Sequence, residues 1–162
     1  MYKAIPFCLL LMLSSAPCDA SPLDKRAFGT VNISASEAIE DETPGILHFS
    51  GEFTMRSDDW FVTSDVATIY GHLDDPDRVL LEGAPAKFRI MRADDMGRNT
   101  IEALAPVVEY LRATNTLKLT GGAVLRLDDE VITSHTIEYD ISSRRYRASG
   151  LDGVLIEVPP TD

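Results

Sequence analysis

Residues Leu117–Leu127, "LKLTGGAVLRL", alternate apolar and polar side chains around a pair of glycines. A period of two is typical of a strand with one buried face, whereas apolar residues in an amphipathic helix recur every three or four positions. Glycine weakens a strand interior and commonly marks a bulge or the close approach of something else. The stretch therefore predicts a half-buried strand interrupted in its middle. From the alternation we expect Gly121 to face inward, leaving room inside the fold, and Gly122 to face outward.

This pattern recurs along the chain. An apolar-x-apolar-x-Gly unit ends at Gly51, Gly83 and Gly121, and a weaker copy ends at Gly150. A second pattern, apolar-x-small-x-x-apolar-x-large, follows in "VTSDVATI", "ALAPVVEY" and "ITSHTIEY". Its three-residue step suggests a corner between two strands. Repeated units of this size usually stack, each closing the core of its neighbour.

Turn-forming clusters separate the apolar runs, and strands at such regular spacing predict an all-β sandwich or barrel. The segment "TIEALAPVVEYLRA" has some helical character, but Pro106 and the β-branched pair Val107 and Val108 favour a strand. In "VLLEGAPAKFRI" the alternation slips by one residue after Pro85, so we expect a bulge there. The clusters are "EDETPG", "RSDD", "HLDDPD", "RADDMGRN", "RATN", "LDDE" and "SSRR".

The N-terminus has the features of an export signal. Lys3 precedes a short apolar run, and "CDA" supplies the small residues that signal peptidase accepts. We predict a signal peptide at 1–20 that is cleaved, a flexible leader at 21–30, one β domain at 31–158 and a tail at 159–162. The apolar run is too short to span a bilayer, and an uncleaved membrane anchor is the alternative.

Charge and cysteine content narrow the function. The formal net charge of −11 argues against nucleic-acid binding and gives no support for broad docking to an anionic membrane surface. Both cysteines, Cys8 and Cys18, lie in the predicted signal peptide, so the exported chain has to be stabilised by its core. Arg144, Arg145 and Arg147 form the only basic cluster along the sequence. That cluster suits either lipid phosphates or a solvated turn.

The sequence does not predict an enzyme. His48, His72 and His135 are scattered without the spacing of metal ligands, and no Gly-x-Ser-x-Gly elbow occurs. The acidic turns "HLDDPD" and "LDDE" lack the spacing of a calcium loop. We expect no catalytic residues, no cofactor and no metal site.

Four motifs, in order, resemble those of the OstA-like family: "VNISASEA", "LHFSGEF", "GAPAKF" and "LTGGAVL…VITSHTIEY". The resemblance runs from Val31 to Ser149. It implies an open, twisted antiparallel β jelly roll built from repeated two-strand units, without catalytic residues or a cofactor. It also implies a periplasmic protein that passes lipopolysaccharide along an apolar groove. Members stack end to end, from an inner-membrane component of the export complex to the N-terminal domain of an outer-membrane barrel.

The inward apolar residues are the candidate lipid-binding set, because an open sandwich would present them as a lining. At any single position, ordinary core packing is the alternative. The set comprises Val31, Ile33, Phe49, Phe53, Val62, Ile69, Phe88, Ile90, Val108, Tyr110, Leu119, Leu125, Ile132, Ile137 and Tyr139.

The two ends of an open sheet are candidate docking sites, since edge strands can pair with another chain by β-augmentation. Ordinary terminal strands with a proline stop are the alternative. Such a contact would also permit head-to-tail self-association of the chain. The upstream candidates are Val31, Asn32, Ile33, Ser34 and Ala35, and the downstream candidates are Leu151, Val154, Leu155, Ile156 and Val158.

Two other functions fit the same patterns. A lipocalin-like closed β-barrel would carry a small apolar ligand in a central cavity. Another OstA-like domain of the same pathway, such as the component anchored in the inner membrane, would share the fold but keep its N-terminal segment.

Overall fold

The computed structural model describes residues 30–94 and 97–159. The predicted signal peptide at 1–20, the leader apart from its last residue, and residues 160–162 of the predicted tail lie outside the described residues. The described chain is almost entirely strand, with one short 3₁₀ helix, η1 (Arg112–Thr114).

The ten strands follow the order that the turn clusters predict, and the ambiguous segment around Pro106 is a strand. The strands are β1 (Asn32–Ser34), β2 (Glu37–Glu40), β3 (Ile46–Arg56), β4 (Trp60–His72), β5 (Asp75–Asp94), β6 (Gly97–Leu111), β7 (Thr116–Leu127), β8 (Glu130–Asp140), β9 (Arg145–Ser149) and β10 (Leu155–Glu157).

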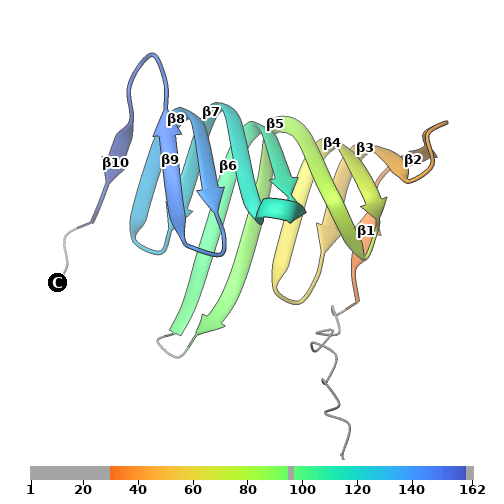
Figure 1. Ribbon diagram of the computed structural model, residues 1–162, viewed down its shortest axis with the longest axis horizontal. Coiled ribbons are helices and arrows are strands. Elements are labelled where there is room, and N and C mark those ends of the chain that lie inside the picture. The colour runs from red at the N-terminus through yellow and green to blue at the C-terminus, as the bar shows by residue number, and fades with distance from the viewer. Residues whose placement is uncertain (1–29, 95–96, 160–162) are drawn as a thin grey trace, which may run out of the picture.

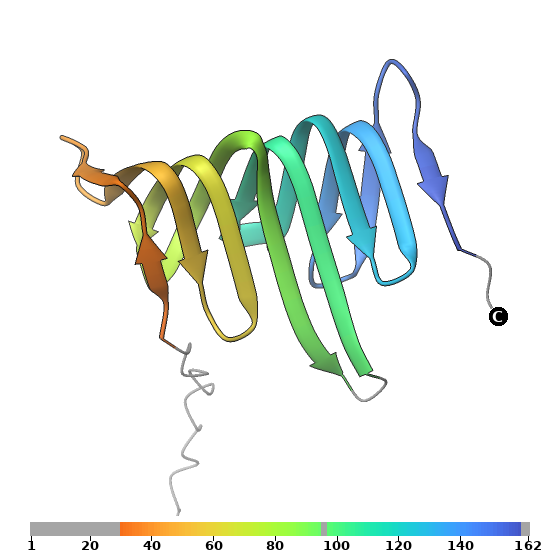
Figure 2. The same ribbon diagram turned by 180° about the vertical axis from the view of Figure 1, so that it is seen from behind.

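All strand pairs are antiparallel and belong to one sheet, in the order β1-β3-β4-β5-β6-β7-β8-β10. The short strand β2 also pairs with β3, and β9 also pairs with β8. The two ends of the sheet lie far apart at opposite ends of an elongated molecule (Figures 1 and 2). The sheet is therefore open, as expected, and the closed-barrel alternative is wrong.

Each long strand bends in its middle. The register shifts in every pair from β3–β4 to β7–β8, at the bulges where the strands turn over in Figure 1. Bulges bend a strand and increase its local twist. The expected corner therefore exists, but it lies inside continuous strands rather than between two strands. The bulge expected at Pro85 is among them, between Glu82 and Ala86.

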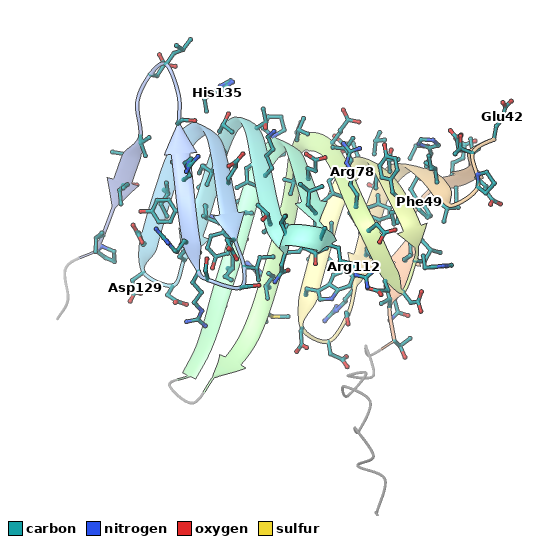
Figure 3. All side chains as sticks on the ribbon, viewed as in Figure 1. Glu42, Phe49, Arg78, Arg112, Asp129 and His135 are labelled. Atoms are coloured by element: carbon teal, nitrogen blue, oxygen red, sulfur yellow. The ribbon has the colours of Figure 1, made fainter. Side chains whose placement is uncertain are left out.

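The bends fold the sheet into two layers. Layer one contains β2, β9 and the halves of β3 to β8 that pair with them; layer two contains β1, β10 and the other halves. Each of the six strands from β3 to β8 crosses between the layers along one side, which we call the corner. The hairpin turns that join β3 through β9 lie on the opposite side, which we call the open edge; His135 and Asp129 mark the two sides in Figure 3. No strand joins the layers at the open edge within the described residues.

The corner requires glycine at Gly51. Gly51 has a φ of +74°, and a Cβ there would lie 2.6 Å from Ser36 Oγ, because Ser36 crosses the corner between β1 and β2. The Ser36 amide donates to the carbonyl oxygens of Ser50 and Gly51, at 3.1 and 2.8 Å. Such a position favours glycine because side chains are strained in the left-handed region and because the space is filled.

The expectation that Gly121 faces inward is wrong. Gly121 and Gly122 are exposed, each with a φ of +96°, and together they oppose His135 of β8. Leu119 and Ala123 are both buried, so the alternation keeps its phase on either side of the bulge, but at the bulge itself the glycine pair stands opposite one residue and faces outward. A Cβ on Gly121 would lie 3.2 Å from the Pro106 ring of the neighbouring strand β6. The close approach is to that strand, and Gly121 leaves no room inside the fold.

Candidate functional site

The inner faces of the two layers form one apolar interior. All fifteen residues of the candidate lipid-binding set belong to it. Val31, Ile33 and Tyr110 are partly buried and pack against the rest, and the other twelve are buried. Phe53, Ile69, Leu125 and Ile137 have no exposed surface at all. The predicted set is thus assembled on one continuous surface, and in this structure it is packed as a core.

The interior narrows toward the corner. Ala67, Ala86, Ala105 and Ala123 lie beside the register shifts and are fully buried. Small side chains let the two layers approach closely there, while larger ones fill the space farther away. The repeated pattern apolar-x-small-x-x-apolar-x-large already indicated these small residues. Its small position is occupied by Ser64, Ala105 and Ser134, all next to the bend. The candidate set omitted these small residues because its members were chosen for apolar bulk.

Several large interior residues were also missed. Leu81 and Leu117 follow the alternation that identified their neighbours, and both are buried. Leu47, Trp60, Leu127 and Tyr146 are partly exposed residues that pack against the core near the hairpin turns of the open edge. Other members of the interior outside the candidate set are Met55, Val79, Ile101, Ala103 and Ile141.

Side chains close the open edge. The ring of Phe88 in layer two stacks on that of Tyr110 in layer one, with centroids 6.4 Å apart. The Tyr146 hydroxyl on β9 donates to Glu130 Oε1, at the layer-two end of β8, at 2.7 Å. Burial raises the pKa of Tyr110, whereas the hydrogen bond to Glu130 is the main cause of the raised pKa of Tyr146. The layers are therefore held together at this edge by separable side-chain contacts.

The predicted docking segments lie at opposite ends of the same layer. The upstream candidates include β1, which pairs with the second half of β3 at one edge of layer two. The downstream candidates surround β10, which pairs with Val131–Thr133 at the other edge. Every residue from Leu151 to Val158 is exposed, including Leu155 and Ile156 at about half their full surface (56% and 47%). An apolar strand at a sheet edge is suited to pairing with another chain.

The edge strand β2 was not predicted as a separate element. The segment expected to be one opening strand is divided at the corner into β1 and β2, which pair with the two halves of β3. All four residues of β2 are exposed, with Ile39 at 54%. This end of the molecule thus presents two short edges, one in each layer.

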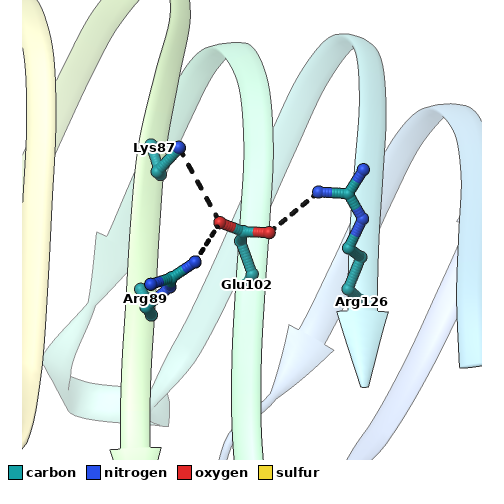
Figure 4. A network of polar contacts seen from close by, with 4 residues as sticks. All are labelled: Lys87, Arg89, Glu102 and Arg126. Carbon is teal, nitrogen blue, oxygen red and sulfur yellow. Dashed lines mark hydrogen bonds and ion pairs between the residues drawn. The ribbon is translucent and has the colours of Figure 1, made fainter. Parts of the chain in front are cut away.

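A group of charges lies on the outer face of layer two (Figure 4). Glu102 is only 8% exposed, and its carboxylate lies among three cations on neighbouring strands. Arg89 Nη2 donates to Oε1 at 2.9 Å, Arg126 Nη1 donates to Oε2 at 2.8 Å, and Lys87 Nζ lies 3.8 Å from Oε1. Burial would raise the pKa of Glu102, but the bonds from Arg126 and Arg89 outweigh it and lower the pKa.

This group corrects the expectation that Arg144, Arg145 and Arg147 form the only basic cluster. Lys87, Arg89 and Arg126 come from β5 and β7, which are separated in the sequence by a complete strand. No run of basic residues marks them, so linear inspection missed them. Register brings them together, because Arg89 pairs with Glu102 and Glu102 pairs with Arg126.

The described residues contain no group of three or more His, Cys, Asp or Glu side chains that could hold a metal ion. His48 lies between Thr68 Oγ1 at 3.2 Å and Asp41 Oδ2 at 3.0 Å, which ties the turn before β3 to β4.

Among the described residues, no helix has the length and apolar character needed to cross a membrane.

Comparisons with known proteins agree with this architecture. The sequence profile of the family described as LptA/(LptD N-terminal domain) LPS transport protein matches residues 32–145. The fold is similar to the crystal structure of LptH from Pseudomonas aeruginosa, described as the LptA-homologous periplasmic component of the conserved lipopolysaccharide transport device. The TM-score is 0.71 at 16% identity, covering 82% of this chain and 96% of that chain. No curated protein sequence matches the chain.

Proposed function

Because the chain belongs to the LptA and LptD N-terminal domain family of lipopolysaccharide transport proteins, we propose that it carries lipopolysaccharide across the periplasm. In this proposal the acyl chains occupy the interior between the two layers. Copies of the chain stack end to end between an inner-membrane component of the export complex and the N-terminal domain of the outer-membrane barrel. Transport then needs no chemical step by this chain.

The observation that carries the proposal is the difference between the two long sides of the fold. Six strands run continuously from one layer to the other at the corner, whereas side chains close the open edge. Separating the layers at the open edge breaks few hydrogen bonds and leaves every strand ladder intact. The interior residues then become a lining that acyl chains can contact.

Energetics favour exchange over tight binding. An acyl chain of about a dozen methylenes loses roughly 10 kcal/mol when exposed to water, at ~0.8 kcal/mol per methylene. The lipid leaves a bilayer in which its chains are already buried, so the net transfer energy to an apolar interior is near zero. Opening the layers also exposes the packed core, and the entering chains restore that burial. Direction must therefore come from elsewhere, and the family resemblance implies an ATP-driven pump at the inner membrane.

The ends of layer two support the stacking part of the proposal. An exposed β10 at one end and β1 at the other allow an extended strand of a partner to continue the sheet. The two ends differ in sequence, so contact between copies is head to tail and produces open chains rather than closed rings. The same geometry would accept a related domain at either end.

Photocrosslinking in cells tests the lipid path. A crosslinking residue is placed at Ile137, inside the fold, or at its neighbour Glu138, which points to the outer face of the same strand. We expect lipopolysaccharide adducts at position 137 and none at position 138 or at Thr120. Equal labelling at 137 and 138, or no labelling at either, would refute the proposed lipid path.

The remaining alternative is the membrane-anchored component of the same pathway. N-terminal sequencing of the exported protein distinguishes the two. A chain that begins at Ser21 supports the periplasmic carrier, whereas a chain that retains residues 1–20 supports the anchored component.

A further inference from the structure

We propose that Lys87, Arg89 and Arg126, which we call the outer cation cluster, bind a phosphate group on the outer face of layer two. The site lies on the opposite side of the sheet from the apolar interior, because Glu102 alternates with the core residues Ile101 and Ala103 on β6; Figure 4 shows the three cations around its carboxylate. Its chemistry is independent of acyl-chain binding, because none of the three side chains belongs to the core.

The cluster has unbalanced charge. Three cations surround one carboxylate, which leaves an excess of two positive charges on a chain whose formal net charge is −11. Both oxygens of Glu102 are already engaged. Each guanidinium has five N–H donors, and each arginine uses one of them in its hydrogen bond to Glu102. The three side chains are 39–51% exposed, so their remaining donors can reach a ligand from solution.

The sheet holds these groups in place. Arg89, Glu102 and Arg126 are directly opposite one another on three adjacent strands, and Lys87 is two residues along β5 on the same face. Both guanidiniums converge on the Glu102 carboxylate. Phosphate oxygens accept paired N–H bonds from arginine, and a fixed pair of guanidiniums loses little freedom when it binds them.

Neighbouring side chains favour an anion at this position. Partly buried Phe61 lies opposite Arg89, and partly buried Leu104 lies opposite Lys87. Apolar neighbours reduce the local dielectric constant, which strengthens attraction between the excess positive charge and a phosphate.

Other ion pairs among the described residues lack this excess. Arg112 lies 2.7 Å from Asp75 Oδ2 and 3.2 Å from Asp77 Oδ1, so one positive charge faces two negative charges. Arg78 pairs one to one with Glu109. Arg112 is therefore a matched control: its side chain is as exposed as those of the cluster (47%) but is surrounded by negative charge.

The phosphate can be free in solution or part of an amphiphile's head group. The second source rests on the proposed function, and the first does not. NMR distinguishes them by following the arginine Nε–H signals of the exported chain during titration. The two probes are inorganic phosphate and a short-chain phosphatidic acid below its micelle concentration, with sodium chloride at matched ionic strength as the control.

We expect saturable shifts of the Arg89 and Arg126 signals with phosphate, and none beyond the chloride control at Arg112. Arg126→Gln should weaken phosphate binding at least fivefold, while Arg112→Gln leaves it unchanged. Glu102→Gln should strengthen binding, because it removes the competing negative charge and keeps the shape of the side chain. If Glu102→Gln does not fold, the comparison of Arg126→Gln with Arg112→Gln tests whether phosphate binds at the cluster.

A purely structural cluster gives a different result. Shifts that do not saturate, or that chloride reproduces, would overturn the proposal, as would equal effects of Arg126→Gln and Arg112→Gln. Phosphatidic acid binding that inorganic phosphate displaces assigns the site to lipid head groups, whereas binding of inorganic phosphate alone assigns it to the free ion. Interior crosslinks without phosphate binding would refute this site and leave the proposed function standing, and the converse result would refute only the lipid path.

Discussion

Tyr146 and Glu130 are joined across the open edge: the phenol hydroxyl on β9 in layer one donates to a carboxylate oxygen of β8 in layer two, at 2.7 Å. The two residues lie near opposite ends of one hairpin, yet they connect the free margins of both layers. This bond and the stacking of Phe88 on Tyr110 close the side of the molecule that no strand crosses.

Removing the hydroxyl should loosen this edge. Tyr146→Phe keeps the ring in place and deletes the hydrogen bond. We therefore expect the free energy of unfolding, measured in urea, to fall by about 1 kcal/mol. Hydrogen exchange should increase first in β9. Tyr70→Phe, whose ring stays beneath Arg78 at 4.8 Å, is the control and should change stability by less than ~0.5 kcal/mol. Equal effects of the two variants would show that the Tyr146 bond does not secure the edge.

Locking the edge should block lipid entry. Cysteines introduced at positions 130 and 146 can be joined by a short bismaleimide, because Cys8 and Cys18 lie in the predicted signal peptide and would not compete. We expect the linked protein to retain its fold and its end-to-end assembly but to lose lipopolysaccharide crosslinking at position 137. The unlinked double variant is the control. Full lipid labelling of the linked protein would exclude entry through the open edge.

The corner should not tolerate a side chain at Gly51. Gly51→Ala adds a Cβ that would lie 2.6 Å from Ser36 Oγ, whereas Gly45→Ala adds one that meets nothing within 4 Å. Both positions have positive φ, so both variants should lose about 1–2 kcal/mol from backbone strain. Gly51→Ala should lose about 1–3 kcal/mol more from overpacking. Adding Ser36→Gly to Gly51→Ala should restore the stability lost to overpacking, as measured by urea denaturation. Equal losses of stability in Gly45→Ala and Gly51→Ala would contradict the close approach of Ser36 to Gly51.

The C-terminal strand should be dispensable for folding but not for assembly. Deleting residues 151–162 removes β10 and the exposed apolar side chains around it, none of which belongs to the core. The thermal midpoint should change little, whereas concentration-dependent association in analytical ultracentrifugation should disappear. Ile156→Asp should weaken association in the same direction. Unchanged association of the truncated chain would place the contact elsewhere.

Acid should weaken the turn between β8 and β9. The backbone amides of Ser143 and Ser142 donate to Asp140 Oδ1, at 3.0 and 2.8 Å, and these bonds lower the pKa of Asp140. A lowered pKa stabilises the folded state above the ordinary value of 3.8, and this contribution is lost as the pH falls through the folded pKa. Asp140→Asn should therefore reduce the loss of stability between neutral pH and pH 3, measured by urea denaturation at each pH. Parallel stability curves for the two proteins would contradict this.

Much of the fold follows from alternation that the sequence shows directly. Leu119 and Leu125 face the interior because a period of two with one apolar face leaves a strand no other way to bury that face. The interior set could therefore be predicted from the residues, whereas the open, antiparallel architecture was expected only from the resemblance to the OstA-like family. Gly121 could not be placed, because its direction depends on a bulge that pairs two residues with one on the next strand.

Away from the bulges, the sequence by itself determined which side chains face inward, since pleating assigns alternate residues to opposite faces. Tertiary structure alone decided what meets across strands and layers. Register placed Lys87, Arg89 and Arg126 around Glu102, and bending brought Tyr146 to Glu130. The reason is physical: local sequence controls the direction of a side chain, whereas its neighbours on other strands depend on bulges and registers that arise only when the whole sheet assembles.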